Sequence, residues 1–168
     1  MKKVLFSILA ASILFACAEP KKEEAATTPM EHIYKPTYTD NFKIGDQKNA
    51  YLAEKFHQDL FAKDYKKAGE IIADTAEFHN EDGSTLKGKA AILDFMEKAF
   101  SQVKFKNYEI VAIIPTVGEN GHQWVNIWDK ADVETPDGKT QKLVWVDSFR
   151  FENGKVVMFE GFVKALKE

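Results

Sequence analysis

The chain has 168 residues, of which 45% are apolar and 29% are charged, the composition of an ordinary globular protein. A single cysteine excludes an intramolecular disulfide framework and a cysteine-based zinc cluster. The formal net charge of −3 argues against a nucleic-acid-binding protein, which needs a basic surface. No apolar run is long enough for a conventional membrane span, and the length fits one folded domain.

The first segment, residues 1–16, has the pattern of a secretory signal peptide. A basic start at Lys2 and Lys3 precedes an apolar stretch that is too short for a stable membrane anchor. The sequence Leu-Phe-Ala-Cys that ends at Cys17 resembles a bacterial lipobox, in which the cysteine sulfur receives a diacylglyceryl group. This resemblance implies that Cys17 is the acylated start of the mature chain. The predicted location is therefore the bacterial cell envelope, with the lipid anchor in the membrane.

Residues 17–45 are predicted to be a flexible tether. The segment contains three prolines and a Lys-Lys-Glu-Glu run, and its apolar residues show no periodicity. Such a segment cannot bury enough apolar surface to offset its ordering entropy. Tyr34, Tyr38 and Phe42 suggest that the last part of the tether lies against the domain. The folded domain is predicted at 46–168.

The first half of this domain has helical patterns. Asp46 can cap a helix, and the spacing of Ala53, Phe56 and Leu60 predicts a buried helical face after it. His57 is expected at the edge of that face. The other elements of this half follow in chain order: a short helix over 65–73, a strand over 77–79, a returning strand over 85–87 and a third helix after Gly88.

The second half consists of predicted strands joined by tight turns. Asn-Gly and Asp-Gly pairs between apolar runs are strong hairpin signals. The predicted strands cover residues 105–117, 123–133, 142–151 and 156–163. Helices followed by an antiparallel meander indicate an α+β fold, with the helices packed on one face of the sheet.

Three stretches together resemble the nuclear-transport-factor-2-like superfamily and its SnoaL-like group. They are ADTAEFHN at 73–80, LKGKAAI at 86–92 and DSFRFENGKV at 147–156, and their order and spacing carry the resemblance. The resemblance implies a cone-shaped fold, with three N-terminal helices on a curved, mostly antiparallel sheet around one apolar pocket. Superfamily members include isomerases and pure ligand binders, and they often dimerise through the open sheet face. The fold therefore does not fix the function.

Asp147 is the first candidate site residue. Alternation along its strand puts Trp145, Asp147 and Phe149 on one largely apolar face, which we expect to look inward. A carboxylate there must be hydrogen-bonded or have a raised pKa. A hydrogen-bonded core residue and a pocket residue both fit this pattern. By the resemblance, Asp147 matches the protonated oxyanion-hole donor of ketosteroid isomerase.

The other catalytic residues of that isomerase have no counterpart in this sequence. The positions that match its general base and its tyrosine hold Asn80 and Phe56, so steroid isomerisation is not expected. His79 precedes Asn80 and is the second acid/base candidate, because a histidine beside Asp147 could transfer protons near neutral pH. A solvent-facing His79 is the alternative.

Aromatic residues of the domain fit either a pocket wall or an ordinary core. The predicted pocket residues are Phe56, Phe78, His79, Asn80, Phe95, Trp124, Asn126, Trp145, Asp147 and Phe159. No two histidines have the spacing of metal ligands, and no phosphate-binding loop is visible. Neither a metal nor a cofactor is therefore predicted.

These patterns leave three hypotheses about function. The first is a lipid-anchored domain that binds a small apolar or aromatic molecule without catalysis. The second is an acid/base enzyme of the cyclase, dehydratase or isomerase type that uses Asp147 and His79. The third is a protein-interaction module, or a homodimer, formed through the open sheet face. Nucleic acid is not an expected partner.

Overall fold

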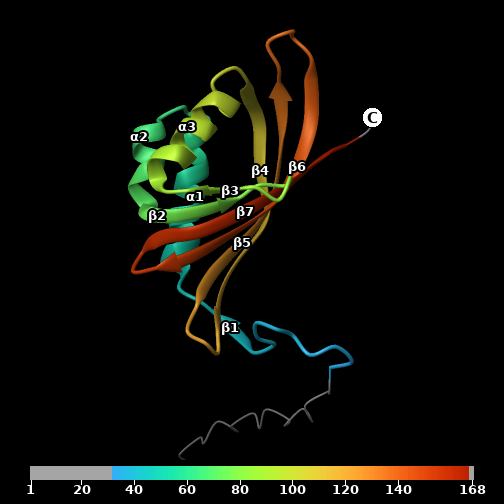
Figure 1. Ribbon diagram of the computed structural model, residues 1–168. Coiled ribbons are helices and arrows are strands. Elements are labelled where there is room, and N and C mark those ends of the chain that lie inside the picture. Colours follow the sequence, from blue (N-terminus) through green and yellow to red (C-terminus); the bar gives the residue numbers. More distant parts are fainter. Residues whose placement is uncertain (1–31, 167–168) are drawn as a thin grey trace, which may run out of the picture. The chain divides into compact units, whose positions relative to one another are not determined.

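The computed structural model describes residues 32–166, and the chain divides into two units, Met1–Lys35 and Pro36–Glu168. The second unit holds every helix and strand of the described residues (Figure 1). Cys17 and most of the predicted tether lie outside the described residues. Within 32–166, no helix combines the length and the apolar character that a membrane span requires.

The predicted order of helices and strands is confirmed from α1 onward, and β1 is an additional strand in the segment predicted as the tether. The helical elements are α1 (Gln47–Phe61), α2 (Tyr65–Ala68), a 3₁₀ turn (Gly69–Ile71) and α3 (Lys89–Phe100). The strands are β1 (Phe42–Ile44), β2 (Ile72–His79), β3 (Thr85–Lys87), β4 (Lys104–Gly118), β5 (Gln123–Glu134), β6 (Thr140–Glu152) and β7 (Lys155–Ala165). Strand β2 begins earlier than predicted because Ile72 and Ala76, both buried, already contribute to the core.

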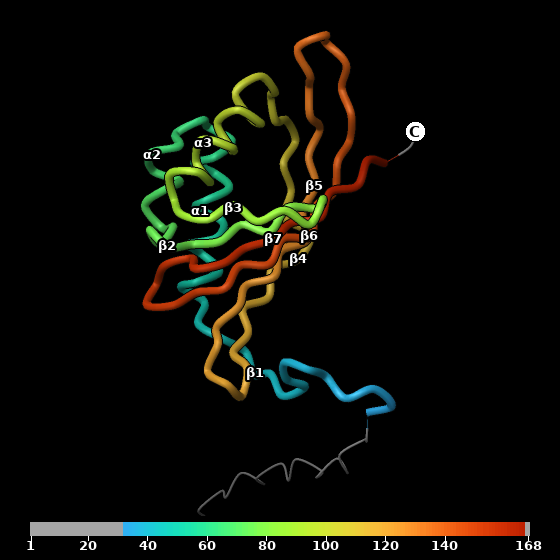
Figure 2. The backbone as a smooth tube through the Cα atoms, in the orientation of Figure 1, coloured from blue at the N-terminus to red at the C-terminus, as the bar shows by residue number. Residues whose placement is uncertain are grey.

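The seven strands form one sheet in the order β1-β4-β5-β6-β7-β2-β3. All neighbours are antiparallel except β2 and β7, which run parallel and lie side by side in Figure 2. Helix α1 packs against β4 and β5, and α3 packs against β2, so the helices cover one face of the sheet. This arrangement is the predicted α+β class.

Helix α1 brings one row of side chains into the core. The Asp46 side chain accepts a hydrogen bond from the Lys48 amide at 2.8 Å and so caps the helix N-terminus. Ala53, Phe56 and Leu60 are buried, as their spacing predicts. His57 is buried with them, only 4% exposed, and does not lie at the edge of this face.

The inner face of the two central strands differs from the prediction in β5. In β6, Phe149 and Phe151 are buried, as expected. The predicted pocket residues Trp124 and Asn126 occupy the opposite face of β5. The buried residues of this strand are Val125, Ile127, Asp129, Ala131 and Val133. The prediction for Trp124 and Asn126 was wrong because it assumed that the face of β5 with the tryptophans points inward. The aliphatic row carries the larger penalty for contact with water, and an indole keeps its N–H satisfied at a surface.

Strand β4 contains two interruptions of its alternation. Phe105 pairs with Val133 in β5, but the register shifts between Lys106 and Glu109 and again between Ile110 and Ala112. Asn107 has a positive φ of 51° at the first shift. Each bulge places an extra residue in β4, so inward-facing positions are not two apart throughout.

The segment predicted as the end of the tether belongs to the second unit. Strand β1 pairs with β4 through Phe42, Lys43 and Ile44. The Tyr38 hydroxyl contacts the ring nitrogen of His122 and accepts the Trp124 indole N–H at 3.1 Å. Contacts of Tyr38 and Phe42 with the domain are therefore as expected.

Candidate functional site

A cavity of about 580 Å³ lies between the helices and the inner face of the sheet. Its wall is largely aromatic and aliphatic, and its polar groups come from α1, β5, β6 and the 80–84 turn. The lining residues are Phe56, His57, Leu60, Phe61, Phe78, Asn80, Glu81, Asp82, Ser84, Leu86, Phe95, Met96, Phe100, Phe105, Asp129, Trp145, Asp147, Phe149, Phe159, Gly161 and Val163. This volume is large enough for a small organic molecule.

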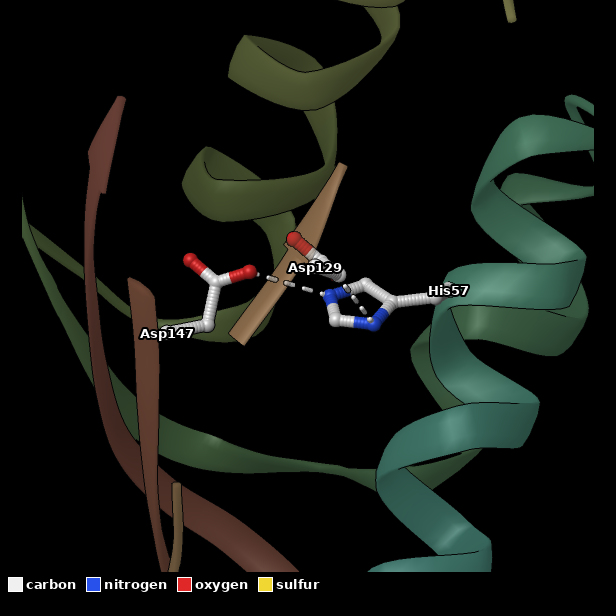
Figure 3. Close-up of side chains that lie close together, drawn as sticks. All are labelled: His57, Asp129 and Asp147. Atoms are coloured by element: carbon white, nitrogen blue, oxygen red, sulfur yellow. Dashed lines mark ion pairs between the residues drawn. The ribbon is translucent and has the colours of Figure 1, made fainter. Parts of the chain in front are cut away.

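Three titratable side chains from three elements meet at the cavity wall. His57 projects from α1 between Asp129 of β5 and Asp147 of β6 (Figure 3). The His57 Nδ1 atom lies 3.7 Å from Asp129 Oδ2, and the Nε2 atom lies 3.3 Å from Asp147 Oδ2. The sheet register explains the two carboxylates: Ile127 pairs with Asp147 and Asp129 pairs with Trp145, so both aspartates share the inner face.

Tyr108 of β4 connects His57 to Asp129. Its hydroxyl donates to Asp129 Oδ2 at 2.7 Å and lies 3.1 Å from His57 Nδ1. Burial raises the pKa of the Tyr108 phenol, and the adjacent Asp129 raises it further, so the hydroxyl keeps its proton. Because that proton goes to Asp129, the oxygen accepts, and His57 Nδ1 carries a proton.

This tautomer determines what faces Asp147. With Nδ1 protonated, a neutral His57 presents the Nε2 lone pair toward Asp147 Oδ2. Two lone pairs at 3.3 Å repel each other unless a proton lies on one of the two atoms. His57 Nε2 and Asp147 Oδ2 are close enough for a proton to pass between them, and Asp147 lines the cavity. An imidazole nitrogen beside a carboxylate at a cavity wall is suited to general acid/base chemistry.

Asp129 is the most deeply buried of the three groups, at 2% exposure. Its Oδ1 atom is buried and has no hydrogen-bond partner among the described residues. Burial raises the pKa of Asp129, and Asp147 adds to this, while His57 and the Tyr108 hydrogen bond act in the opposite direction. Such a perturbed carboxyl beside a cavity is typical of functional sites.

Gly161 makes room for Asp147. The two residues are paired across β6 and β7, and a Cβ atom built at Gly161 would lie 2.2 Å from Asp147 Oδ1. Any side chain at position 161 would therefore displace the carboxylate. The site depends on a residue that contributes no functional group.

The structure places seven of the predicted pocket residues in the cavity wall: Phe56, Phe78, Asn80, Phe95, Trp145, Asp147 and Phe159. His79, Trp124 and Asn126 are not among the lining residues. His79 alternates with the inward-facing Phe78, and its Nε2 atom lies 3.4 Å from Glu77 Oε2 with a side chain that is 39% exposed. His79 and Asp147 are therefore not brought together. His57 takes the place that was expected for His79.

The sequence analysis did not identify His57, Asp129 or Tyr108 as site residues. His57 lies four residues after Ala53 and three before Leu60, so the helical period does place it on the buried face. Asp129 interrupts an aliphatic row in β5 as Asp147 interrupts an aromatic row in β6, and this parallel was the available signal. Tyr108 had no such signal, because the bulges of β4 hide its inward orientation.

The same three residues offer donor atoms for a metal ion. One ligand atom from each of His57, Asp129 and Asp147 lies within 4.8 Å of the other two. The prediction of no metal considered paired histidines and overlooked a histidine with two carboxylates, a set that divalent cations accept. In this geometry, Tyr108 occupies Asp129 Oδ2 and His57 Nδ1, so a bound ion would compete with those contacts.

Comparison with known proteins agrees with this architecture. The model of the SnoaL-like domain family matches residues 53–159. No curated protein shows a significant match to the sequence.

Several solved structures share the fold at low sequence identity. A Mycobacterium tuberculosis LEH-like epoxide hydrolase is 14% identical, with a TM-score of 0.54 over 70% of this chain and 84% of that one. A Bacillus subtilis protein assigned as an isomerase is 18% identical, with a TM-score of 0.58 over 70% and 87%. An NTF2-like protein from Burkholderia xenovorans LB400 is 19% identical, with a TM-score of 0.55 over 73% and 93%. The chain therefore belongs to the SnoaL-like domain family and has the nuclear-transport-factor-2-like fold.

Proposed function

We propose that the domain is an acid/base enzyme for a small, mainly apolar molecule, with His57 and Asp147 as the proton-transferring pair. The observation that carries this proposal is the 3.3 Å approach of His57 Nε2 to Asp147 Oδ2 at the wall of a 580 Å³ cavity. Asp147 borders the space that a substrate would occupy. Tyr108 and Asp129 act as positioning residues, because the Tyr108 hydroxyl contacts Nδ1 of the imidazole and donates a hydrogen bond to Asp129.

The structural neighbours support a reaction class and not a substrate. An isomerase and an epoxide hydrolase are named among them, and both reactions move a proton to or from a carbon or an oxygen. In this site a carboxylate–imidazole pair would take a proton from the substrate at one atom and return one at another. Asn80 and Phe56 line the cavity at the positions expected for the steroid isomerase base and tyrosine, so that specific reaction is not proposed.

Proton exchange tests this function without knowledge of the product. The chain is incubated in D₂O with a panel of small apolar ketones and, in parallel, with a panel of epoxides. Mass spectrometry then measures deuterium incorporation into the ketones and opening of the epoxides. Deuterium incorporation or epoxide opening that Asp147→Asn abolishes supports the proposal. The matched control is Asp94→Asn, an identical change at a residue whose side chain is 63% exposed on α3.

The same panel distinguishes an enzyme from a protein that binds a ligand without turning it over. If thermal shift and tryptophan fluorescence detect a ligand but no compound exchanges or reacts, the cavity is a non-catalytic binding site. That outcome contradicts the enzyme proposal and supports the simpler ligand-binding function predicted from the sequence.

We also propose that the domain is tethered to the cell envelope through acylated Cys17. Support comes from the lipobox-like Leu-Phe-Ala-Cys sequence and the apolar segment before it. Replacement of Cys17 by serine should move the protein from the membrane to the soluble fraction. Unchanged membrane partitioning of Cys17→Ser would contradict lipidation at this residue.

A second candidate function involves the outer face of the sheet. Trp128, Val146 and Phe162 pair across β5, β6 and β7 and are 38%, 38% and 58% exposed. An apolar row of this kind on an open sheet favours contact with another protein, such as a second copy of the chain. Sedimentation of the chain and of Val146→Glu tests this: a dimer that the glutamate dissociates supports the interface, and a monomer in both cases contradicts self-association.

A further inference from the structure

The titratable groups of the cavity wall are mostly acidic. Four carboxylates line it: Glu81 and Asp82 on the 80–84 turn, and Asp129 and Asp147 on the sheet. Lysine and arginine are absent from the described residues that line the cavity, and His57 is the one lining group that can become cationic. An anionic ligand would therefore meet repulsion from these carboxylates.

Of the four carboxylates, the two on the sheet, Asp129 and Asp147, are the candidates to bind a cation. The Asp129 side chain is only 2% exposed, and its Oδ1 atom has no hydrogen-bond partner among the described residues. An unpaired buried acceptor is costly, and a donor brought by a ligand would satisfy it. Glu81 and Asp82, in contrast, already accept hydrogen bonds from the Val163 and Ser84 amides.

An indole accompanies these carboxylates. Trp145 is the cross-strand partner of Asp129 and lies two residues before Asp147, so the three side chains share the inner face. The ring of Trp145 also packs near that of Phe105, with centroids 6.3 Å apart. Aromatic faces attract cations, and tryptophan does so most strongly.

We infer that the cavity binds an organic cation: an apolar molecule whose protonated amine is held by Asp147 and Asp129 beside Trp145. The phenylalanine-rich remainder of the wall takes the apolar body. This inference rests on the ligand cavity of the proposed function and specifies the charge of what enters it. It does not depend on whether the bound molecule then reacts.

Three probes of matched shape test the charge assignment. Phenylbutylamine, phenylbutanol and phenylbutanoate are titrated into the chelator-treated full-length chain at neutral pH, with tryptophan fluorescence and calorimetry as readouts. The amine should bind about tenfold or more tightly than the alcohol, and the carboxylate should bind most weakly. Chelator treatment removes any metal ion that could mask or mimic the effect.

Variants locate the effect within the cavity. Asp147→Asn should lower the affinity for the amine about tenfold while the affinity for the alcohol changes less than twofold. Asp94→Asn, which makes the same change on the exposed side of α3, should leave the order of the probes unaltered. The order of the three probes on the unaltered chain remains decisive even if Asp147→Asn fails to fold.

Other outcomes overturn the inference in distinguishable ways. Equal or tighter binding of the carboxylate contradicts the charge assignment but leaves a ligand-binding cavity, and so the proposed function, in place. An amine preference that persists in both Asp147→Asn and Asp129→Asn contradicts the location. Failure of all three probes to bind also overturns the inference, and the exchange panel then decides on the proposed function separately.

Discussion

The described residues contain two histidine–carboxylate pairs at nearly the same separation, one in the cavity wall and one on the outer face of β2. His57 Nε2 lies 3.3 Å from Asp147 Oδ2, and His79 Nε2 lies 3.4 Å from Glu77 Oε2. The His57 side chain is 5% exposed, while those of His79 and Glu77 are each 39% exposed. Tyr108 of β4 and Asp129 of β5 adjoin the first pair, whereas Lys87 of β3 adjoins the second.

The carboxyl groups around the two histidines shift in opposite directions. Burial raises the pKa of Asp129, whereas a hydrogen bond from Lys87, with a second from His79, lowers the pKa of Glu77. On the outer face of β2, water and lysine stabilise the charged form of the carboxyl group; in the cavity wall, the loss of water destabilises it. A short distance between a histidine and a carboxylate therefore does not by itself identify a functional site. The two pairs differ in burial and in the charged groups around them.

The largest expected difference is in catalysis. His57→Gln should reduce any exchange or turnover found in the D₂O panel by about 10²- to 10⁴-fold, because the proton-transferring group is lost. His79→Gln is the matched change in the exposed pair and should keep the rate within about twofold. Equal losses in the two variants, with both proteins folded by circular dichroism, would refute the distinction drawn between the pairs.

The position of Asp147 can be disturbed without changing any titratable group. Gly161→Ala places a methyl group against the Asp147 carboxylate and should cost about 1–3 kcal/mol in the free energy of unfolding. In the double variant Gly161→Ala/Asp147→Ala the steric conflict is absent, so the two effects should be strongly non-additive. Additive effects in urea unfolding would mean that the strand pair accommodates the methyl group elsewhere.

The link between His57 and Asp129 is tested at Tyr108. Tyr108→Phe leaves Asp129 Oδ2 and His57 Nδ1 without this partner and should lower the free energy of unfolding by about 1–3 kcal/mol. Tyr51→Phe is the control, because Tyr51 is 62% exposed on α1. The expectation fails if urea unfolding gives the same small change for both variants.

The smallest effects are in the pH dependence of stability, where the two pairs should differ in sign. Because the native pKa of Asp129 is raised, the unfolded chain loses that proton first, and stability declines as pH rises from the ordinary carboxyl range through the native pKa. Asp129→Asn should remove this decline. Because the native pKa of Glu77 is lowered, its contribution is lost as pH falls, and Glu77→Gln should remove that loss.

Urea unfolding between about pH 3 and pH 8 measures both slopes. The exposed Glu77 should give the weaker change because solvent screens its contacts. If Asp129→Asn and Glu77→Gln changed the slope of the unaltered chain in the same direction, the contrast between the cavity and the outer face of β2 would be contradicted.

Most of the fold could be predicted from local patterns. The spacing of Ala53, Phe56 and Leu60 indicated α1, and the Asn-Gly and Asp-Gly turns delimited the long strands. The alternation that placed Asp147 inward also holds, because β6 keeps a regular register with β5 throughout. Each of these signals acts over a few residues of sequence, which is why a single sequence carries them.

The candidate site was harder to predict because it depends on relations between distant segments. Asp129 joins the site through the pairing of β5 with β6, and Tyr108 joins it through the bulges in β4. His79 was a reasonable candidate by residue type, but alternation with Phe78 turns it away from the cavity. The choice between two faces of β5 was decided by burial of its aliphatic row, which a search for large aromatic residues overlooked.

The place of β7 in the sheet has a consequence for how the chain acquires its structure. This strand comes after all the others in sequence, yet it lies between β6 and β2, and its pairing with β2 joins segments about as far apart as Ile72 and Val156. The helical half of the domain therefore cannot close its sheet until the final strand has been synthesised. Contacts of such long range make folding slow, so the chain remains longer in forms whose strand edges are unpaired and prone to aggregate.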